Sequence, residues 1–237
     1  EGTPLLRVRE ATGADIRGFD FTTEMVDYAK ELFAENDLSQ DWVIKADVEN
    51  YDSFSDLVDE PFDAAVCFGV MPHVNSDVNS LKNMNRVLKP GGRAFVEFRN
   101  ILFNMFTMNR FTHGFFMEEL LGDAPAEIRD ATDSYLKGVM DMNKPPLRLD
   151  AEAGKPGYDA IKAQMHNPLA ADELFAAAGF SDVKIHWYHF HPTLPMLEGN
   201  GVSREAWRNH SVDMENNSAD WRGYFLCSAY VVEAVKA

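Results

Sequence analysis

The chain has 237 residues, of which 46% are hydrophobic and 25% charged, a balance typical of a soluble globular protein. Its 22 basic and 38 acidic residues give a formal net charge of -16, which works against binding to nucleic acid or to an anionic membrane. No run approaches the ~20 consecutive apolar residues of a membrane span, and the N-terminus has no secretory pattern. Cys67 and Cys227 lie in apolar runs, which favours buried thiols in a cytoplasmic protein over a disulfide framework.

The first hundred residues alternate between short apolar runs and amphipathic segments. The pattern predicts strands over 14–20, 41–47, 62–70 and 93–98, and helices over 22–36 and 78–88. The run over 62–70 is apolar almost throughout, which predicts a strand buried on both faces of a parallel sheet. The KPGG sequence from Lys89 to Gly92 predicts a helix end and a turn. Strands and helices at this spacing predict βαβ units with right-handed crossovers.

The alternation stops at Asn100 and resumes near residue 166. The stretch from Phe103 to Met117 is rich in Phe and Met, and it predicts either the core of a small helical subdomain or a lid over a bound molecule. Further on, the sequence predicts a short helix capped by Gly179, a strand over 181–190, a polar helix from Ser203 and a final strand over 223–235. We therefore expect an α/β domain of residues 1–100 and 166–237 with a helical insertion of residues 101–165.

Acidic residues close two of the predicted strands. Ligands of open α/β sheets bind at the carboxyl edge, where a carboxylate can accept both hydroxyls of a ribose. Asp20 is placed for this role, because Gly2 lies 18 positions upstream, close to the ~20-residue spacing between a glycine-rich turn and the ribose-binding acid. Asp47 closes the next strand and could accept a hydrogen bond from an adenine amino group. The alternative for each acid is a solvated strand end.

Four segments occur in the order and spacing of class I S-adenosylmethionine-dependent methyltransferases: GFDFTTEMVDYAKE, VIKADVEN, FDAAVCFGVMPHV and LKNMNRVLKPGGRAFVEF. AADELFAAAGFSDVKI resembles that family's helix before its sixth strand, and FLCSAYVVEAVK its closing antiparallel strand. The sequence thus resembles a small-molecule type of this family over most of its length, outside 101–165 and the stretch after His191. The resemblance implies a Rossmann-like, doubly wound and mostly parallel sheet with an antiparallel C-terminal strand, a helical insertion after the family's fifth strand, and S-adenosyl-L-methionine as cofactor.

The resemblance also implies which residues contact the cofactor. It makes Asp20 the ribose-binding acid, with Phe21 beside it, and it places Asp47 and Val48 next to the adenine. The residues that it places on the methionine side are Phe68, Gly69 and Val70.

The family's first strand ends in an acid-x-Gly-x-Gly-x-Gly turn, and here only its last step is recognisable. Gly2 matches the final glycine and would contribute to cofactor binding, whereas the first strand and the leading glycines are missing. That strand is central in the family, between the strands that end at Asp20 and near Val70. Without it a buried parallel sheet would carry a gap one strand wide. We therefore expect the sequence to be a fragment, truncated within the glycine-rich motif.

Methyl transfer is an in-line displacement, so a protein mainly aligns the reactants and supplies a base where the acceptor must lose a proton. His73 follows the strand that ends at Val70, and an imidazole there could deprotonate a hydroxyl acceptor; the alternative is a histidine that only packs at a helix start. Glu97 and Arg99 end the strand over 93–98 and could bind a polar acceptor, or they could form a surface ion pair.

Histidines gather in the HWYHFH segment that ends at His191. His189 and His191 would share one face of a strand, as two metal ligands can. No acid lies close by and Pro192 ends the strand, so we expect a polar pocket lining that includes His189, and no metal site. His113 and Tyr135 are further candidates for the acceptor site, because insertions after the fifth strand shape that site in the resembled family.

The expected function is methyl transfer from S-adenosylmethionine to a small-molecule acceptor, with O-methylation as the chemistry. One alternative is an NAD(P)-dependent oxidoreductase, since Asp20 after a glycine-rich turn serves that fold equally well; the VLKPGG sequence and the C-terminal strand argue against it. Another alternative is a catalytically silent methyltransferase-like binding domain. No nucleic-acid or membrane partner is expected, and the sequence specifies neither the acceptor nor the oligomeric state.

Overall fold

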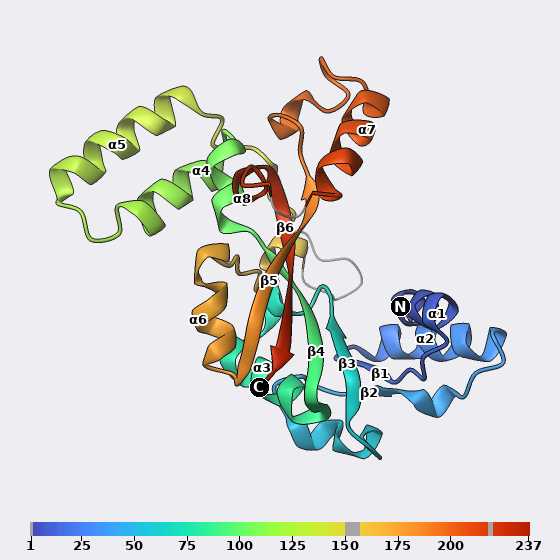
Figure 1. The fold of residues 1–237 in the computed structure, drawn as a ribbon. Helices are drawn as coiled ribbons and strands as arrows, with labels where there is room; N and C mark the ends of the chain where they lie inside the picture. Colours follow the sequence, from blue (N-terminus) through green and yellow to red (C-terminus); the bar gives the residue numbers. More distant parts are fainter. Residues whose placement is uncertain (1, 150–156, 218–219) are drawn as a thin grey trace.

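The computed structural model describes residues 2–149, 157–217 and 220–237, and its strands form two separate sheets (Figure 1). A two-stranded sheet pairs β1 with β2 in parallel, and a four-stranded sheet has the order β3-β4-β6-β5. β3 runs parallel to β4, whereas β6 runs antiparallel to both β4 and β5. The strands are β1 (Gly18–Asp20), β2 (Val43–Lys45), β3 (Phe62–Cys67), β4 (Leu88–Arg99), β5 (Phe180–Phe190) and β6 (Cys227–Lys236). The mixed α/β architecture with an antiparallel C-terminal strand confirms the predicted fold class.

The helices predicted over 22–36 and 78–88, before Gly179 and from Ser203 are present, whereas residues 223–226, predicted as the start of the final strand, form a short helix. Ser76 caps the third helix by accepting a hydrogen bond from the backbone N–H of Asn79, and Ser203 caps the predicted polar helix in the same way through Ala206. The helices are α1 (Thr3–Thr12), α2 (Thr23–Glu35), α3 (Asp77–Val87), α4 (Arg110–Gly114), α5 (Ala126–Val139), α6 (Ala171–Ala176), α7 (Arg204–Glu215) and α8 (Gly223–Leu226). No helix in the described ranges is both long and apolar enough to cross a membrane.

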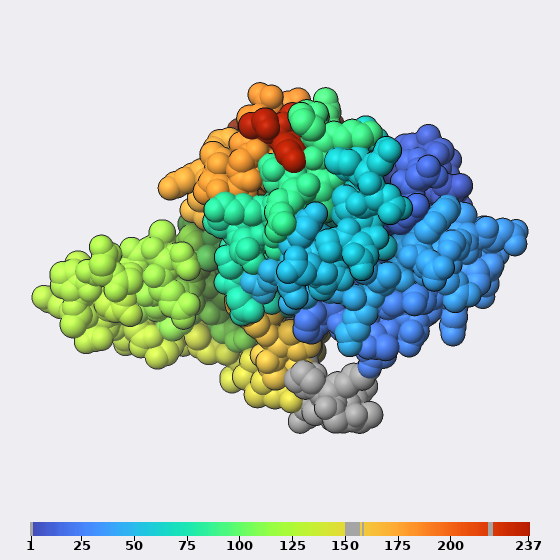
Figure 2. Space-filling view, turned by 90° about the horizontal axis from the view of Figure 1, so that it is seen from below, coloured from blue at the N-terminus to red at the C-terminus, as the bar shows by residue number. Residues whose placement is uncertain are grey.

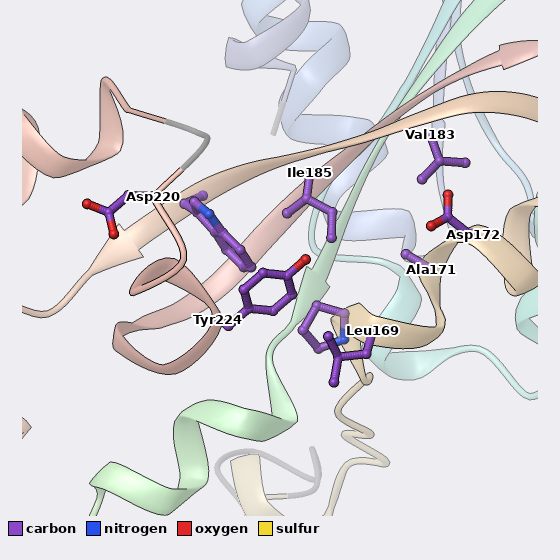
Figure 3. A pocket seen from close by; sticks show the side chains of 9 residues that line it. Leu169, Ala171, Asp172, Val183, Ile185, Asp220 and Tyr224 are labelled. Atoms are coloured by element: carbon purple, nitrogen blue, oxygen red, sulfur yellow. The ribbon is translucent and has the colours of Figure 1, made fainter.

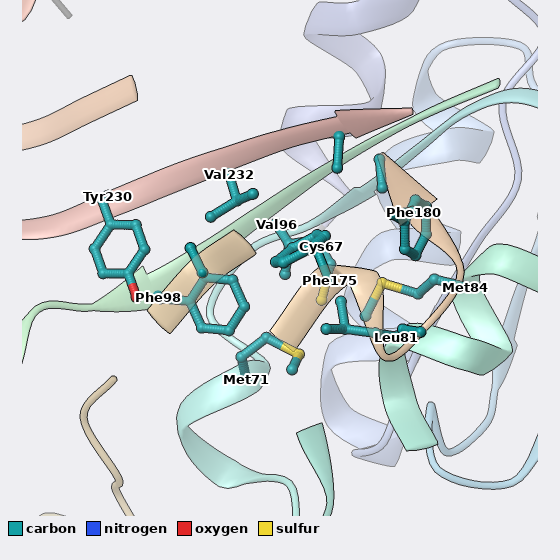
Figure 4. Close-up of a cluster of buried hydrophobic side chains, with 14 of the residues drawn as sticks. Cys67, Met71, Leu81, Met84, Val96, Phe98, Phe175, Phe180, Tyr230 and Val232 are labelled. Atoms are coloured by element: carbon teal, nitrogen blue, oxygen red, sulfur yellow. The ribbon is translucent and has the colours of Figure 1, made fainter. Parts of the chain in front are cut away.

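The main hydrophobic core lies between the four-stranded sheet and the helices α3 and α6 (Figure 4). Phe98 of β4 is only 1% exposed; its ring stacks on Tyr230 at 5.5 Å between centroids and meets Phe175 edge-on at 6.0 Å. Leu81 and Met84 bring the apolar face of α3 to the same core, as the helical spacing predicts. This core therefore fixes β3, β4 and β6 relative to one another.

A second, smaller core belongs to the N-terminal part of the chain. Val26, Ala29 and Phe33 form the buried face of α2 and pack against Val43 of β2 and Ile16. Partly buried leucines of α1 complete it. The β1–β2 sheet is therefore packed by its own helices, independently of the main core.

The prediction that the strand over 62–70 is buried on both faces is wrong. β3 ends at Cys67, its Val66 side chain is 44% exposed, and Ala64 is also exposed. The reason lies in the two faces of the strand: Cys67 and the partly buried Ala65 pack into the main core, whereas the alternating Ala64 and Val66 lie on the opposite face and are exposed. The outer edges of β3 and β1 are also not paired to a strand of the described residues.

The predicted turn at Lys89–Gly92 is also corrected. β4 begins at Leu88, directly after α3, and includes these residues. Gly91 takes a φ of 76°, which glycine adopts without strain, and the register with β3 shifts between Phe62 and Ala64. The KPGG sequence thus forms a distorted strand start and not a separate turn.

The insertion is helical, as predicted, and it projects from the body of the molecule (Figures 1 and 2). A 3₁₀ segment (Ile101–Phe106) leads into α4, which continues as a π-helical stretch (Phe115–Leu120). α4 and α5 form a hairpin directed away from the β1–β2 sheet. Within α5 only Leu136 is buried, so the hairpin is attached mainly through its α4 end.

Candidate functional site

The carboxyl ends of β1 and β2 lie side by side. The backbone N–H of Ala46 donates to the carbonyl of Asp20 at 3.0 Å, which continues the parallel ladder one step beyond the strands. This bond sets Asp20 beside the residue that precedes Asp47. Two predicted site acids from different parts of the chain are therefore neighbours at one sheet edge.

Each of these carboxylates is held by its own turn and keeps one oxygen for a ligand. Oδ1 of Asp20 accepts hydrogen bonds from the N–H and the hydroxyl of Thr22, at 2.8 and 2.9 Å. Oδ1 of Asp47 accepts from the N–H of Glu49 at 2.9 Å. Within the described chain the second oxygen of each carboxylate accepts no hydrogen bond. This edge can therefore accept hydroxyl or amino hydrogens from a ligand.

Exposed aromatic rings lie next to these acids and at the end of β3. Phe21 follows Asp20 and is 70% exposed, and Phe68 follows β3 and is 47% exposed. Gly69 has a φ of 71°, and a Cβ built there would meet nothing within 4 Å, so its backbone faces open space. Carboxylate acceptors, flat apolar rings and an accessible backbone together suit a ligand that carries a sugar diol and a heteroaromatic base. Val48 is buried and contributes to the main core.

Glu97 ties the end of β4 to the loop after β3. Its Oε2 accepts a hydrogen bond from the N–H of Gly69 at 2.9 Å. Its charge also contributes, after burial, to raising the pKa of Tyr188 on β5. Glu97 thus lies between the carboxyl ends of β3 and β5 and orders the Phe68–Val70 loop. Arg99, the last residue of β4, accepts a bond at its carbonyl from the N–H of His166 at 2.8 Å.

His73 is exposed and its ring orientation is fixed. Its Nδ1 lies 2.6 Å from the carbonyl oxygen of Lys162. A carbonyl can only accept, so Nδ1 carries the proton and Nε2 of the neutral ring keeps its lone pair. Gln164 strengthens this contact, since its N–H donates to the carbonyl of Pro72 at 2.9 Å. The segment that returns from the insertion therefore orients the predicted base.

The predicted alternation of His189 and His191 on one strand face does not hold. His189 lies within β5 but has a φ of 54°, a left-handed backbone that disturbs the alternation of side chains, and β5 ends at Phe190, before His191. Burial, followed by the charge of His189, lowers the pKa of His191 to about 4, so its ring is neutral at pH 7. The described ranges contain no group of three His, Cys, Asp or Glu residues that could hold a metal. His189 stacks on Tyr188 at 3.9 Å between ring centroids and stays a prediction for the acceptor site.

The structure places the remaining predicted residues away from these strand ends. His113 and Tyr135 are on the projecting hairpin: Nε2 of His113 bonds Oδ1 of Asp133 at 2.7 Å, and Tyr135 is 68% exposed. Gly2 begins α1 with a φ of 79°, and a Cβ there would come within 3.1 Å of the Cβ of Ala29. Its absent side chain therefore allows α1 to approach α2. The acceptor and cofactor roles of these three residues stay predictions.

Sequence reasoning missed two residues that organise the site. Thr22 fixes Asp20, and the Asp-x-Thr spacing of an Asx turn could have indicated it. Glu49 binds the start of the segment before α3 through Asn75 and Ser76. No local pattern announces Glu49, because its partners lie more than 25 residues away along the chain.

Two pockets of the described residues lie elsewhere. A pocket of about 450 Å³ lies between the start of α6, β5 and the segment before β6 (Figure 3). Another, of about 300 Å³, lies between α1 and the end of α2. Neither is lined by a predicted site residue. The lining of the larger one is Pro168, Leu169, Ala171, Asp172, Val183, Ile185, Trp187, Asp220 and Tyr224.

The first part of the chain matches a known protein family. Residues 1–96 match a family model described as a methyltransferase domain. That segment contains β1, β2, β3 and most of β4, and with them both acids of the candidate site. No curated protein sequence matches this chain.

Solved structures show the same fold at low identity. A SAM-dependent methyltransferase from Archaeoglobus fulgidus is 15% identical with a TM-score of 0.50, covering 99% of this chain and 82% of that one. A proposed sarcosine dimethylglycine methyltransferase from Galdieria sulphuraria is 11% identical with a TM-score of 0.52, covering 100% and 75%. A proposed methyltransferase from Haloferax volcanii, in complex with the activator Trm112, is 13% identical with a TM-score of 0.50, covering 99% and 78%. At these identities the likeness concerns the fold alone.

Proposed function

We propose that the chain is a class I S-adenosylmethionine-dependent methyltransferase and that it methylates a hydroxyl group of a small-molecule acceptor; the support is the methyltransferase-domain match of residues 1–96 and the shared fold. The observation that carries the cofactor site is the pair of strand-end carboxylates, Asp20 and Asp47, each held by a turn and each with an oxygen left for a ligand. The match of residues 1–96 to a methyltransferase domain supports this proposal over the oxidoreductase alternative.

The residues of the candidate site fit S-adenosylmethionine. Asp20 would accept the ribose hydroxyls, and Asp47 would accept from the adenine amino group, with the exposed ring of Phe21 nearby. Phe68, Gly69 and Val70 would line the methionine side. When bound, S-adenosylmethionine supplies a methyl group on a sulfonium for in-line displacement by a nucleophile.

His73 is the candidate base on the acceptor side. Its Nδ1–H is engaged by the carbonyl of Lys162, which leaves Nε2 to take the proton of an acceptor hydroxyl. The acceptor oxygen becomes a stronger nucleophile as that proton leaves. Glu97 and Arg99, at the end of the neighbouring β4, would bind polar groups of the acceptor, and the charge of -16 disfavours an anionic one.

The domain arrangement supports this division of roles. We propose that residues 1–100 and 166–237 bind the cofactor and that residues 101–165 shape the acceptor site. The support is the contact of Lys162 and Gln164, at the end of the insertion, with the His73 loop. We further propose that an additional parallel strand completes the cofactor site between β1 and β3, where each has one edge without a described partner and Val66 and Phe68 are exposed.

The direct test of this function is thermal melting with S-adenosylhomocysteine. A ligand at 100 times its Kd adds about 2.7 kcal/mol of stability, which raises the Tm measurably. We would melt this chain and a version extended at its N-terminus by an apolar strand and a Gly-x-Gly-x-Gly turn. Stabilisation of the extended version, alone or more strongly, is the expected result. If neither version responded to S-adenosylhomocysteine, and NAD stabilised one, the proposed cofactor site would be wrong.

The proposed chemistry has a separate test. A panel of small hydroxyl and amine acceptors, incubated with S-adenosylmethionine and followed by mass spectrometry, should give methylated hydroxyl products. In His73→Gln the turnover of such an acceptor should fall by about a hundredfold, the lower end of the contribution of a general base. The Kd for S-adenosylhomocysteine should stay unchanged. Undiminished turnover in His73→Gln, or methylated amines alone, would contradict base-assisted O-methylation.

A further inference from the structure

Glu49 connects the loop after β2 to the segment that begins α3. Its Oε2 accepts hydrogen bonds from the N–H and the Nδ2 of Asn75, at 2.9 and 3.1 Å. Its Oε1 accepts from the N–H of Ser76 at 2.8 Å. One carboxylate thus receives three hydrogen bonds from two consecutive residues, which fixes both its position and its orientation. We call this group of contacts the Glu49 clamp.

Backbone contacts of the same loop extend the clamp along α3. Nδ2 of Asn79 donates to the carbonyl of Glu49 at 2.8 Å, and Nδ2 of Asn83, only 5% exposed, donates to the carbonyl of Val48 at 2.9 Å. The carboxylate also lies at the N-terminal end of α3, where the helix dipole favours a negative charge. Charge-assisted bonds of this kind are stronger than neutral ones. The clamp is therefore a strong, local link.

The position of the clamp gives it a role beyond stability. On one side of the clamp, Glu49 lies two residues after Asp47, and Oδ1 of Asp47 accepts a hydrogen bond from the N–H of Glu49. On the other side of the clamp, Asn75 and Ser76 directly follow the loop that contains Gly69 and His73. The β1–β2 sheet and the β3–β4 pair share no strand pairing in the described structure. Their relative position must therefore be set by contacts such as those of Glu49.

We propose that Glu49 is a positioning residue that holds the two halves of the cofactor site at the separation that an adenosyl ligand spans. One half is the acid edge of Asp20 and Asp47, and the other is the loop at Gly69. The inference rests on the proposed function. It adds a residue that positions the two halves of the site without contacting the ligand. A ligand that bridges both halves depends on the clamp, whereas a ligand confined to one half does not.

The test compares Glu49→Gln with Glu60→Gln, the same substitution at an exposed position. Glutamine removes the charge and places an amide NH₂ against backbone N–H donors, so at least one clamp bond is lost. At a temperature where both variants are folded, titration calorimetry should give a Kd for S-adenosylhomocysteine about tenfold weaker in Glu49→Gln, or about 1.4 kcal/mol. The Kd for adenosine, measured by ligand-observed NMR, should change less than about twofold because adenosine occupies one half only.

Asn75→Ala removes the Nδ2 donor to the same carboxylate. Combining it with Glu49→Gln tests whether the two residues are energetically coupled. If both residues act in one clamp, the loss of affinity for S-adenosylhomocysteine in the double variant should be smaller than the sum of the losses in the two single variants, and additive losses would overturn the clamp. An unchanged Kd in Glu49→Gln, or an equal loss for adenosine and S-adenosylhomocysteine, would overturn the positioning role. Failure of both this chain and its extended version to bind either ligand would instead overturn the proposed cofactor site, so the two failures are distinguishable.

Discussion

Replacement of Asp20 by alanine is expected to weaken binding of S-adenosylhomocysteine roughly 300-fold. Two charge-assisted hydrogen bonds to ribose hydroxyls contribute about 3.5 kcal/mol together, and each 1.4 kcal/mol is tenfold in Kd. Titration calorimetry on the form of the chain that S-adenosylhomocysteine stabilises gives the Kd directly. Asp20 lies at the end of β1 and has an oxygen that its own turn does not use. Substitution of any other proposed cofactor residue should therefore weaken the Kd less.

Two further variants separate ligand contact from local structure. Asp20→Asn keeps an oxygen that can accept from Thr22 but loses the charge, so its Tm should match the wild type while its Kd weakens about thirtyfold. Asp59→Asn makes the same change at an exposed position and should bind normally. If Asp20→Asn bound S-adenosylhomocysteine as tightly as Asp59→Asn, Asp20 would not be the ribose-binding acid.

Phe98→Ala should lower the free energy of unfolding by about 3 to 5 kcal/mol, the usual cost of removing a buried phenylalanine ring. Phe98 is almost fully buried and contacts rings on α6 and β6 and the ring of His166, at 4.8 Å between centroids. The cavity left behind would be lined by groups that β4, β6 and α6 hold rigidly, so little collapse can compensate. Urea unfolding followed by far-UV circular dichroism measures the loss.

The matched control for Phe98 is Trp221→Ala, because Trp221 is a large aromatic residue that is 68% exposed. Its removal should change the free energy of unfolding by less than about 0.5 kcal/mol. Similar losses in the two variants would show that the ring cluster around Phe98 is not the centre of the main core. A small loss in Phe98→Ala with a changed denaturant slope would point instead to a partly unfolded starting state.

Local patterns in the sequence were sufficient for the elements and for the acid edge. Hydrophobic spacing indicated α2 and α3, and the acids at the ends of two strands are indeed neighbours. These features depend on interactions within a few residues or between consecutive strands. The ends of β1 and β2 needed only the rule that parallel strands align their carboxyl ends.

Features that depend on distant partners were not predictable in this way. The apolar composition of β3 indicated burial, but burial on both sides requires packing against each face of the strand, and composition cannot show whether that packing is present. The predicted alternation of His189 and His191 failed because the backbone of His189, although within β5, turns left-handed at a point that no sequence pattern marks. Glu49 reads as an ordinary loop acid, and only the folded chain shows that its partners are Asn75 and Ser76.

The open edge of β3 has a consequence for the behaviour of the chain in concentrated solution. Unpaired N–H and C=O groups beside apolar side chains form a template on which another polypeptide can add as a strand. Ala64, Ala65 and Val66 present such an edge with no charged residue among them, whereas natural edge strands often carry lysine or proline as protection. Whatever covers this edge therefore decides between a dispersed protein and one that self-associates through its own sheet.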